Sequence, residues 1–258
     1  MPELNQLLGI PEVASKHGPE LDYMLELVHW LMLILFLIWT PVFIYTLFRF
    51  RQSKNPKASH TGAKGRLSTI QEIGVVIAEV VLLLAFAIPA WAELKDDFPD
   101  EKDAIVVHVV GEQFAWNVHY PGPDGVFGKR SPEKIDLATN PLGLDLQDPD
   151  GMDDIITIGQ LNLPVNKPVI VHVLSKDVIH SFSLIEMRVK QDAIPGLDIP
   201  VYFTPTKITP EGVRWEINCA QLCGLGHSTM RGFYKIMSQE DYDAWMQKEL
   251  DLLKEYGR

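Results

Sequence analysis

The segment 219–230 gathers the residue types that bind soft metal ions. Cys219 and Cys223, the only cysteines of the chain, lie four residues apart; His227 follows after four more residues, and Met230 after three more. Thiolate and imidazole ligands suit both zinc and copper, but a weak thioether ligand beside His and Cys is typical of copper electron-transfer centres. The spacing therefore predicts a copper site.

Three other interpretations of this segment stay open from the sequence. The two cysteines would close a small disulfide loop in an oxidising compartment. They would also suit a structural zinc site, or a buried reduced pair with an unrelated His and Met nearby. Copper is the interpretation that uses all four side chains.

A single loop does not complete a copper site, so we expect a further ligand from elsewhere, and His180 is the best candidate. Val and Ile dominate the preceding run 169–174, which reads as a buried strand with Pro168 at its start. His180 would lie on the loop that leaves this strand. Alone, it is equally compatible with an ordinary core or surface histidine.

Two apolar runs, 27–48 and 73–91, are each long enough to cross a bilayer as a helix. Acidic residues precede the first run, and its core is too long for a signal peptide, so we expect it to remain in the mature protein. The predicted organisation is an outer segment 1–26, a first span 27–48, a basic loop 49–70, a second span 71–92, an outer domain 93–237 and a C-terminal helix 238–258.

Charge sets the expected orientation of this hairpin. Between the spans lie six basic residues and no acidic one: Arg49, Arg51, Lys54, Lys57, Lys64 and Arg66. The positive-inside rule puts this loop in the cytoplasm, which leaves both termini and the outer domain in the periplasm of a bacterial inner membrane. The formal net charge of the whole chain is −11, and we expect no nucleic-acid partner.

The outer domain reads mainly as strands, over 104–110, 114–120, 155–159, 169–174, 201–204, 214–218 and 232–237. This spacing suits a β-sandwich or a small barrel. The insert 121–154 is rich in Pro, Gly and Asp and reads as a long surface loop, whose acidic run lacks the pattern of a calcium loop. Residues 238–255 predict an amphipathic helix with Ser238 as its N-cap.

With these motifs in view, the chain resembles subunit II of the haem-copper cytochrome c oxidases. The resemblance rests on four segments that occur in the family's order: Gly111-x-Gln113-Phe114-x-Trp116, His180-Ser181-Phe182, the run 188–196, and Cys219-x3-Cys223-x3-His227-x2-Met230. It implies a two-helix transmembrane hairpin, an all-β cupredoxin domain with a Greek-key sandwich or barrel, and a C-terminal helix.

The resemblance also implies a dinuclear copper centre, CuA, bridged by the thiolates of Cys219 and Cys223. His180 and His227 would each complete one ion, with Met230 and the backbone carbonyl of Gln221 as weak ligands. The implied partners are oxidase subunit I, other oxidase subunits, membrane lipid and a cytochrome c donor. Oxygen would be reduced to water on subunit I, not on this chain.

Two departures from the family pattern are expected to matter. Relatives carry Glu at the position of Gln221, where its carboxylate reaches a magnesium ion at the subunit I interface; an amide is a poorer ligand, which puts that site in doubt. Phe114 stands where relatives have the Trp that receives the electron, and Trp116 matches a second Trp. This change suggests a donor that is membrane-held or part of a partner complex.

Glu72 matches by position the glutamate at the mouth of the family's K proton channel, so it is a candidate for the proton path. Glu79, within the second span, falls where many relatives have Pro, and the resemblance assigns it no role. Two other functions remain in view: the CuA subunit of a nitric oxide reductase, whose hairpin and cupredoxin would look alike, and a membrane-tethered copper-binding protein.

Overall fold

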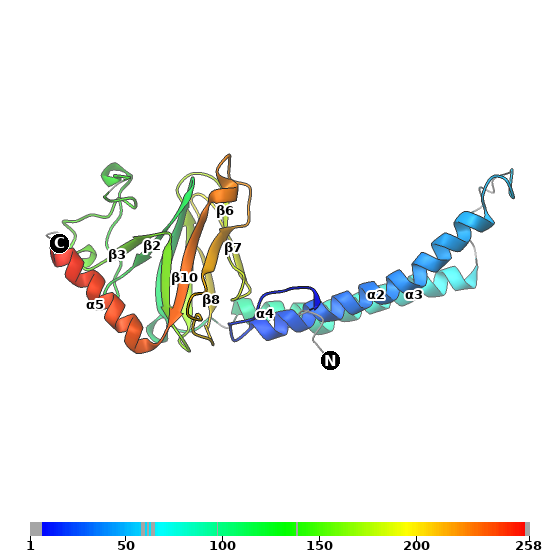
Figure 1. The fold of residues 1–258 in the computed structure, drawn as a ribbon, viewed down its shortest axis with the longest axis horizontal. Helices are drawn as coiled ribbons and strands as arrows, with labels where there is room; N and C mark the ends of the chain where they lie inside the picture. The colour runs from blue at the N-terminus through cyan, green and yellow to red at the C-terminus, as the bar shows by residue number, and fades with distance from the viewer. Residues whose placement is uncertain are drawn as a thin grey trace. The chain divides into compact units, whose positions relative to one another are not determined.

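A computed structural model describes residues 7–57, 60, 62, 65–96, 98–137 and 139–255. The chain forms two compact units. The first contains the long helices within 20–97, and the second contains everything from Phe98 onward together with Pro11–Pro19. Figure 1 traces the chain through both units.

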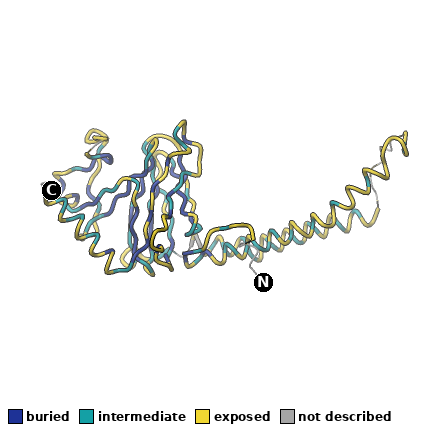
Figure 2. Tube along the Cα trace, in the orientation of Figure 1, coloured by how far each residue is buried: buried dark blue, intermediate teal, exposed yellow. Residues whose placement is uncertain are grey.

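The first unit is built from long apolar helices. Helix α2 runs from Gly18 to Arg49, and α3, from Arg66 to Leu82, continues through the π-helical turn η1 (Leu83–Ala87) into α4 (Ile88–Asp96). In the described residues, the most apolar part of each candidate span, Gly18–Arg49 and Arg66–Glu93, contains no buried residue, and Figure 2 shows both helices mostly in yellow and teal. Helix α2 begins nine residues before the predicted span 27–48, because its acidic first turns are also helical.

The π-helical turn has a local cause. Pro89 has no N–H to donate to the preceding turn, and its ring crowds the carbonyl groups one turn earlier. The amide of Ile88 bonds the carbonyl oxygen of Leu83, five residues back, which widens the helix at this point. The second span therefore continues past its proline as a helix.

The second unit is a sandwich of two five-stranded sheets. One has the order β3-β2-β1-β5-β8 and the other β4-β10-β9-β6-β7, with parallel pairs β1–β5 and β4–β10 among otherwise antiparallel neighbours. The strands are β1 (Ile105–Glu112), β2 (Ala115–Tyr120), β3 (Ile155–Ile158), β4 (Gln160–Pro164), β5 (Val169–Ser175), β6 (His180–Leu184), β7 (Val189–Ala193), β8 (Ile199–Phe203), β9 (Trp215–Cys219) and β10 (Arg231–Met237).

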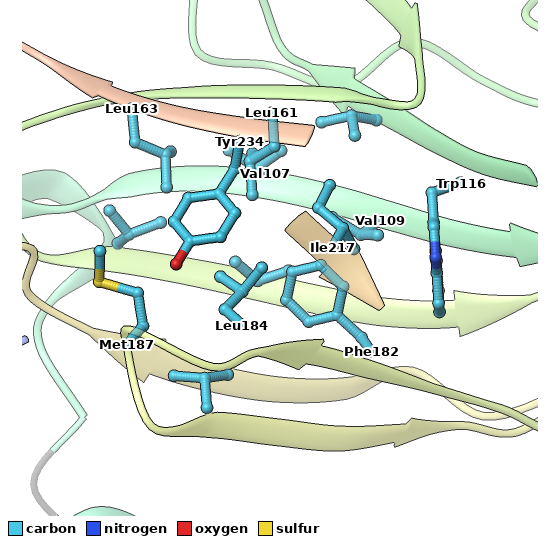
Figure 3. Packing of buried hydrophobic residues seen from close by; sticks show 14 of the residues in the cluster. Val107, Val109, Trp116, Leu161, Leu163, Phe182, Leu184, Met187, Ile217 and Tyr234 are labelled. Atoms are coloured by element: carbon cyan, nitrogen blue, oxygen red, sulfur yellow. The ribbon is translucent and has the colours of Figure 1, made fainter. Parts of the chain in front are cut away.

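The core lies between the sheets because alternate strand residues point inward. Val107 and Val109 of β1 meet Phe182 and Leu184 of β6, and Ile217 of β9 packs beside them (Figure 3). All five are fully buried. Full burial of such side chains contributes about 1.5–3 kcal/mol each, which holds β6 and β9, the strands that contain His180 and Cys219, in place within the sandwich.

Helix α5 (Gln239–Glu255) closes one edge of the sandwich, as predicted. Ser238 caps this helix, because its hydroxyl oxygen accepts a hydrogen bond from the amide of Asp241 at 3.1 Å. Trp245 packs edge-on against Tyr120 of β2, with ring centroids 5.1 Å apart. The predicted architecture of two apolar helices, an all-β sandwich and a C-terminal helix is confirmed.

The structure corrects three local expectations. Strands β4, β6 and β7 were not predicted, because β6 alternates serines with apolar residues and β7 contains three polar residues out of five. His180 is therefore the first residue of a strand, not part of a loop. Part of the insert 121–154 is packed, with Leu144 and Asp154 almost fully buried.

The short segment Pro11–Pro19 is an unexpected part of the β-domain. Ala14 is fully buried in its core, and its amide donates to the carbonyl oxygen of Glu186 at 2.8 Å. The hydroxyl of Ser15 donates to the carbonyl oxygen of Met187 at 2.7 Å. Residues that precede the first long helix are thus anchored to the domain that follows the second.

Candidate metal centre

Two adjacent strands bring the predicted ligands together. Phe182 of β6 pairs with Cys219 at the end of β9, so His180 lies beside the start of the loop 219–230. The amide of Ala220 donates to the carbonyl oxygen of Ser181 at 2.9 Å, which fixes the loop to β6. Residues 39 positions apart in the chain therefore meet at one end of the sandwich.

The side chains form a compact set of sulfur and nitrogen atoms. The two cysteine sulfurs lie 3.8 Å apart, and His180 Nδ1 lies 3.9 Å from the sulfur of Cys219. His227 Nδ1 lies 3.7 Å from the sulfur of Cys223, and Met230 Sδ lies at the same distance from that sulfur. Each histidine therefore lies beside a different cysteine.

The backbone adds one more donor atom. The carbonyl oxygen of Gln221 lies 3.1 Å from the sulfur of Cys219, while the exposed side chain of Gln221 has no part in this contact. The ligating atoms of His180, Cys219 and Cys223 lie within 4.8 Å of one another. All six predicted groups are therefore close together, and their role as ligands remains a prediction.

Burial shapes the chemistry of the thiols. Burial raises the pKa of Cys223 to about 11, and the hydrogen bond and the charge of Cys219 add to this effect. Two thiolates this close would repel each other, which favours the protonated form of Cys223. A bound cation reverses the balance, because metal ligation deprotonates a thiol outright.

A carboxylate orients the first histidine. Asp177 Oδ1 lies 2.8 Å from Nε2 of His180, so the opposite nitrogen of the fully buried ring faces Cys219. Burial acts to raise the pKa of Asp177, but hydrogen bonds from His180 and from the amides of Gln113 and Val178 outweigh it and lower that pKa. The carboxylate is therefore ionised when it holds the ring.

Gln113 joins the two ligand segments from the β1–β2 turn. Its amide donates to Asp177 Oδ2 at 2.7 Å, and its side-chain Nε2 donates to the carbonyl oxygen of Cys223 at 2.6 Å. Gly111 lies on the same side, where an added Cβ would come within 2.9 Å of the His180 ring and 3.1 Å of Trp116. Only glycine leaves room for the ring at this position.

A family model matches this domain. The match covers residues 105–236, and the family is described as cytochrome C oxidase subunit II, periplasmic domain. The chain is also 30% identical over 238 residues to the alternative cytochrome c oxidase subunit 2 of Bradyrhizobium diazoefficiens, a match that spans 92% of this chain and 82% of that protein. This chain belongs to the cytochrome c oxidase subunit II family.

Other matches agree in kind. Cytochrome c oxidase subunit 2 of Cereibacter sphaeroides is 28% identical over 225 residues, which cover 81% of this chain and 69% of that protein. Among solved structures, the periplasmic domain of subunit II of the Bradyrhizobium japonicum cytochrome oxidase is 25% identical and covers 60% of this chain and 98% of that chain, with a TM-score of 0.43. Members of this family are subunits of an oxidoreductase complex. Membership implies a copper centre, and the sulfur and nitrogen donor atoms described above fit copper.

The two aromatic residues expected at the electron-accepting surface differ in exposure. Phe114 is 38% exposed, whereas Trp116 is fully buried. The Phe114 ring lies so close to the loop 219–230 that a Cβ added at Gly226 would come within 2.4 Å of it. Trp116 packs edge-on against the His180 ring, with centroids 6.0 Å apart. Phe114 therefore lies at the surface and Trp116 lies beneath it, against a predicted ligand.

Glu72 lies in the other unit, on α3, where it accepts a hydrogen bond from the hydroxyl of Ser68 at 3.1 Å. Sequence reasoning missed the roles of Asp177, Gln113 and Gly111 around the ligands. The signal for Asp177 was its position three residues before His180, and the other two lie within the Gly111-x-Gln113 motif. Their partners, however, come from distant segments.

Proposed function

We propose that this chain is the electron-accepting subunit of a terminal cytochrome c oxidase. The observation that carries the proposal is the pair of cysteine sulfurs 3.8 Å apart, each with its own histidine. Two ions held by two shared thiolates fit this arrangement better than one tetrahedral zinc ion, which would leave the Met230 thioether without a role.

In this proposal His180, His227, Cys219 and Cys223 hold a dinuclear copper centre, with Met230 and the carbonyl oxygen of Gln221 as weak ligands. When bound, the centre would accept one electron at a time and share it between the two ions. The protein supplies rigidity: Asp177 orients the His180 ring, and the loop 219–230 is fixed to β6 and to Gln113. A fixed ligand set limits rearrangement when the charge changes.

The electron would arrive from a c-type cytochrome at the Phe114 side and leave toward the haems of subunit I, where oxygen is reduced. Support for the first step is the exposed ring of Phe114 against the metal loop. A phenyl ring in place of an indole gives the donor a smaller contact and no N–H. The donor remains proposed as a membrane-held cytochrome or a partner complex.

The proposed location is a bacterial inner membrane, with the copper domain in the periplasm. Two observations support it. The segment before the first helix and the domain after the second belong to one unit, as the proposed orientation, with both ends of the hairpin on the periplasmic side, would require. The connection between the helices carries the basic residues that favour the cytoplasm.

Electron paramagnetic resonance on the copper-loaded full chain in detergent tests the copper assignment. A seven-line mixed-valence spectrum with two coppers per chain is expected. A four-line spectrum, or a site filled by zinc with no signal, would rule out the dinuclear centre. Oxygen uptake by the purified complex separates a terminal oxidase from a nitric oxide reductase, and magnesium analysis of that complex tests the effect of Gln221.

A further inference from the structure

Glu112 and Lys176 form an ion pair next to the residues that orient the predicted ligands. The carboxylate of Glu112, the last residue of β1, accepts a hydrogen bond from the ammonium group of Lys176, which directly follows β5. The two side chains are only 17% and 19% exposed. A partly buried ion pair is weakly screened by salt, and loss of one partner leaves the other charge uncompensated. The pair therefore differs from a surface ion pair, whose contribution is small.

Each partner of this ion pair is held by further contacts. The second carboxylate oxygen of Glu112 accepts a hydrogen bond at 2.8 Å from Nδ2 of Asn117, which is fully buried in β2. The ammonium group of Lys176 also donates to the carbonyl oxygen of Pro141 in the insert, at 2.8 Å. The backbone amide of Lys176 donates to the carbonyl oxygen of Gly111 at 3.0 Å. Four segments of the chain are thus joined at one point.

The residues that directly follow the two partners are Gln113 and Asp177, which contact the predicted ligands. They are bonded to each other, since the amide of Gln113 donates to Asp177 Oδ2 at 2.7 Å. Asp177 then holds the His180 ring, and the Gln113 side chain holds the carbonyl group of Cys223. A shift of either backbone segment would therefore disturb both a histidine ligand and the loop 219–230.

We propose that the Glu112–Lys176 ion pair positions the copper ligands, and this inference rests on the copper centre of the proposed function. The pair holds the β1–β2 turn against the segment after β5, so that Gln113 and Asp177 meet the ligands in one fixed arrangement. The insert 121–154 takes part through its bond to Lys176. Glu112 and Lys176 are positioning residues, because they act on the ligands through their neighbours in the chain.

The test measures copper affinity by competition with a chelator, on the full chain in detergent. Lys176→Met should weaken copper binding about tenfold, the lower end of the effect of residues that orient metal ligands. Lys176→Arg keeps the charge and the hydrogen-bond donors, and its affinity should stay within about threefold of wild type. Lys207→Met is the matched control, because it removes an ion pair with Glu12 near the opposite end of β5, and it should leave the affinity unchanged.

Two further measurements separate positioning from a general loss of stability. In a chain that already carries Asp177→Asn, Lys176→Met should weaken binding at most about threefold more, since residues of one network are not additive. In the otherwise wild-type chain, Lys176→Met should blur the seven-line copper spectrum, because a loosened His180 makes the two ions unequal. A fold that is merely less stable would leave that spectrum unchanged.

Unchanged copper affinity in Lys176→Met overturns the proposal, and so does a full tenfold further loss in the Asp177→Asn chain. An equal loss in Lys176→Arg would also overturn it. The wild-type spectrum keeps this result separate from the proposed function. Failure of that function would appear in the wild type as a missing seven-line signal, whereas failure of this inference leaves that signal intact and shows only in the variants.

Discussion

Replacing His108 with Phe should remove much of the acid sensitivity of the β-domain. His108 lies on the outer face of the sheet, directly between His119 of β2 and His172 of β5, and stacks on Phe127 of the insert with centroids 3.8 Å apart. Its Nδ1 is buried and has no hydrogen-bond partner in the described structure. A phenyl ring keeps the stacking area and leaves no unsatisfied nitrogen.

The magnitude follows from the depressed pKa of this imidazole. Burial, together with the smaller effect of the charges of Arg130, His119 and His172, lowers the pKa of His108 from 6.5 to about 3. Between these two values the unfolded chain binds a proton that the folded domain refuses, so stability is complete above pH 6.5 and falls as the pH drops below it. At pH 5, about 1.5 units below the pKa of the unfolded imidazole, the free energy of unfolding is therefore lower by about 2 kcal/mol, since each pH unit costs about 1.36 kcal/mol.

The assay is urea denaturation of the full chain in detergent, followed by tryptophan fluorescence at pH 7.5 and at pH 5. Between pH 7.5 and pH 5, the free energy of unfolding of the wild type should fall by about 2 kcal/mol more than that of His108→Phe. His172→Phe is a useful comparison, because His172 has a carboxylate partner, Asp198, at 2.7 Å. Equal losses of unfolding free energy in wild type and His108→Phe would refute the reasoning, since they would show that the His108 imidazole is not the group that binds a proton on unfolding.

Three further predictions concern the metal centre. Met230→Leu should keep two coppers per chain but raise the reduction potential, because loss of a weak donor destabilises the oxidised form; redox titration measures this, and a fall in copper content would contradict it. Asp177→Asn should weaken copper binding about 10–100-fold by releasing the His180 ring, as competition with a chelator would show, and unchanged affinity would dismiss the orienting role. Gly111→Ala should destabilise the domain by about 1–3 kcal/mol, since its Cβ would meet the His180 ring at 2.9 Å; an unshifted urea midpoint would count against that contact.

The two aromatic residues of the Gly111-x-Gln113-Phe114-x-Trp116 motif differ in exposure. Both Phe114 and Trp116 match residues of one motif, and the sequence gives them equal standing as electron-accepting residues. In the fold, β2 begins at Ala115, so Trp116 lies within the strand and is buried, whereas Phe114 lies in the turn before it and stays at the surface. Strand alternation could not have separated the two positions, because residues two apart in a strand face the same side.

The sequence by itself determined the features that depend on neighbouring residues. The spacing of Cys219, Cys223, His227 and Met230 indicates a soft-metal loop, and the two apolar runs indicate a hairpin, because each signal lies within one short stretch of chain. Strong β-branched runs likewise predicted seven of the strands. Strands β6 and β7 escaped prediction because both are rich in polar residues, and the backbone pairing that makes them strands exists only in the folded sheet.

Tertiary structure alone decided how the centre is completed. His180 reaches the cysteines because β6 pairs with β9, and Asp177 and Gln113 hold that geometry through contacts between segments up to 110 residues apart. The anchoring of Pro11–Pro19 to the β-domain is of the same kind. Such contacts depend on sheet order and register, which are fixed by burial of the whole core and leave no local pattern in the sequence.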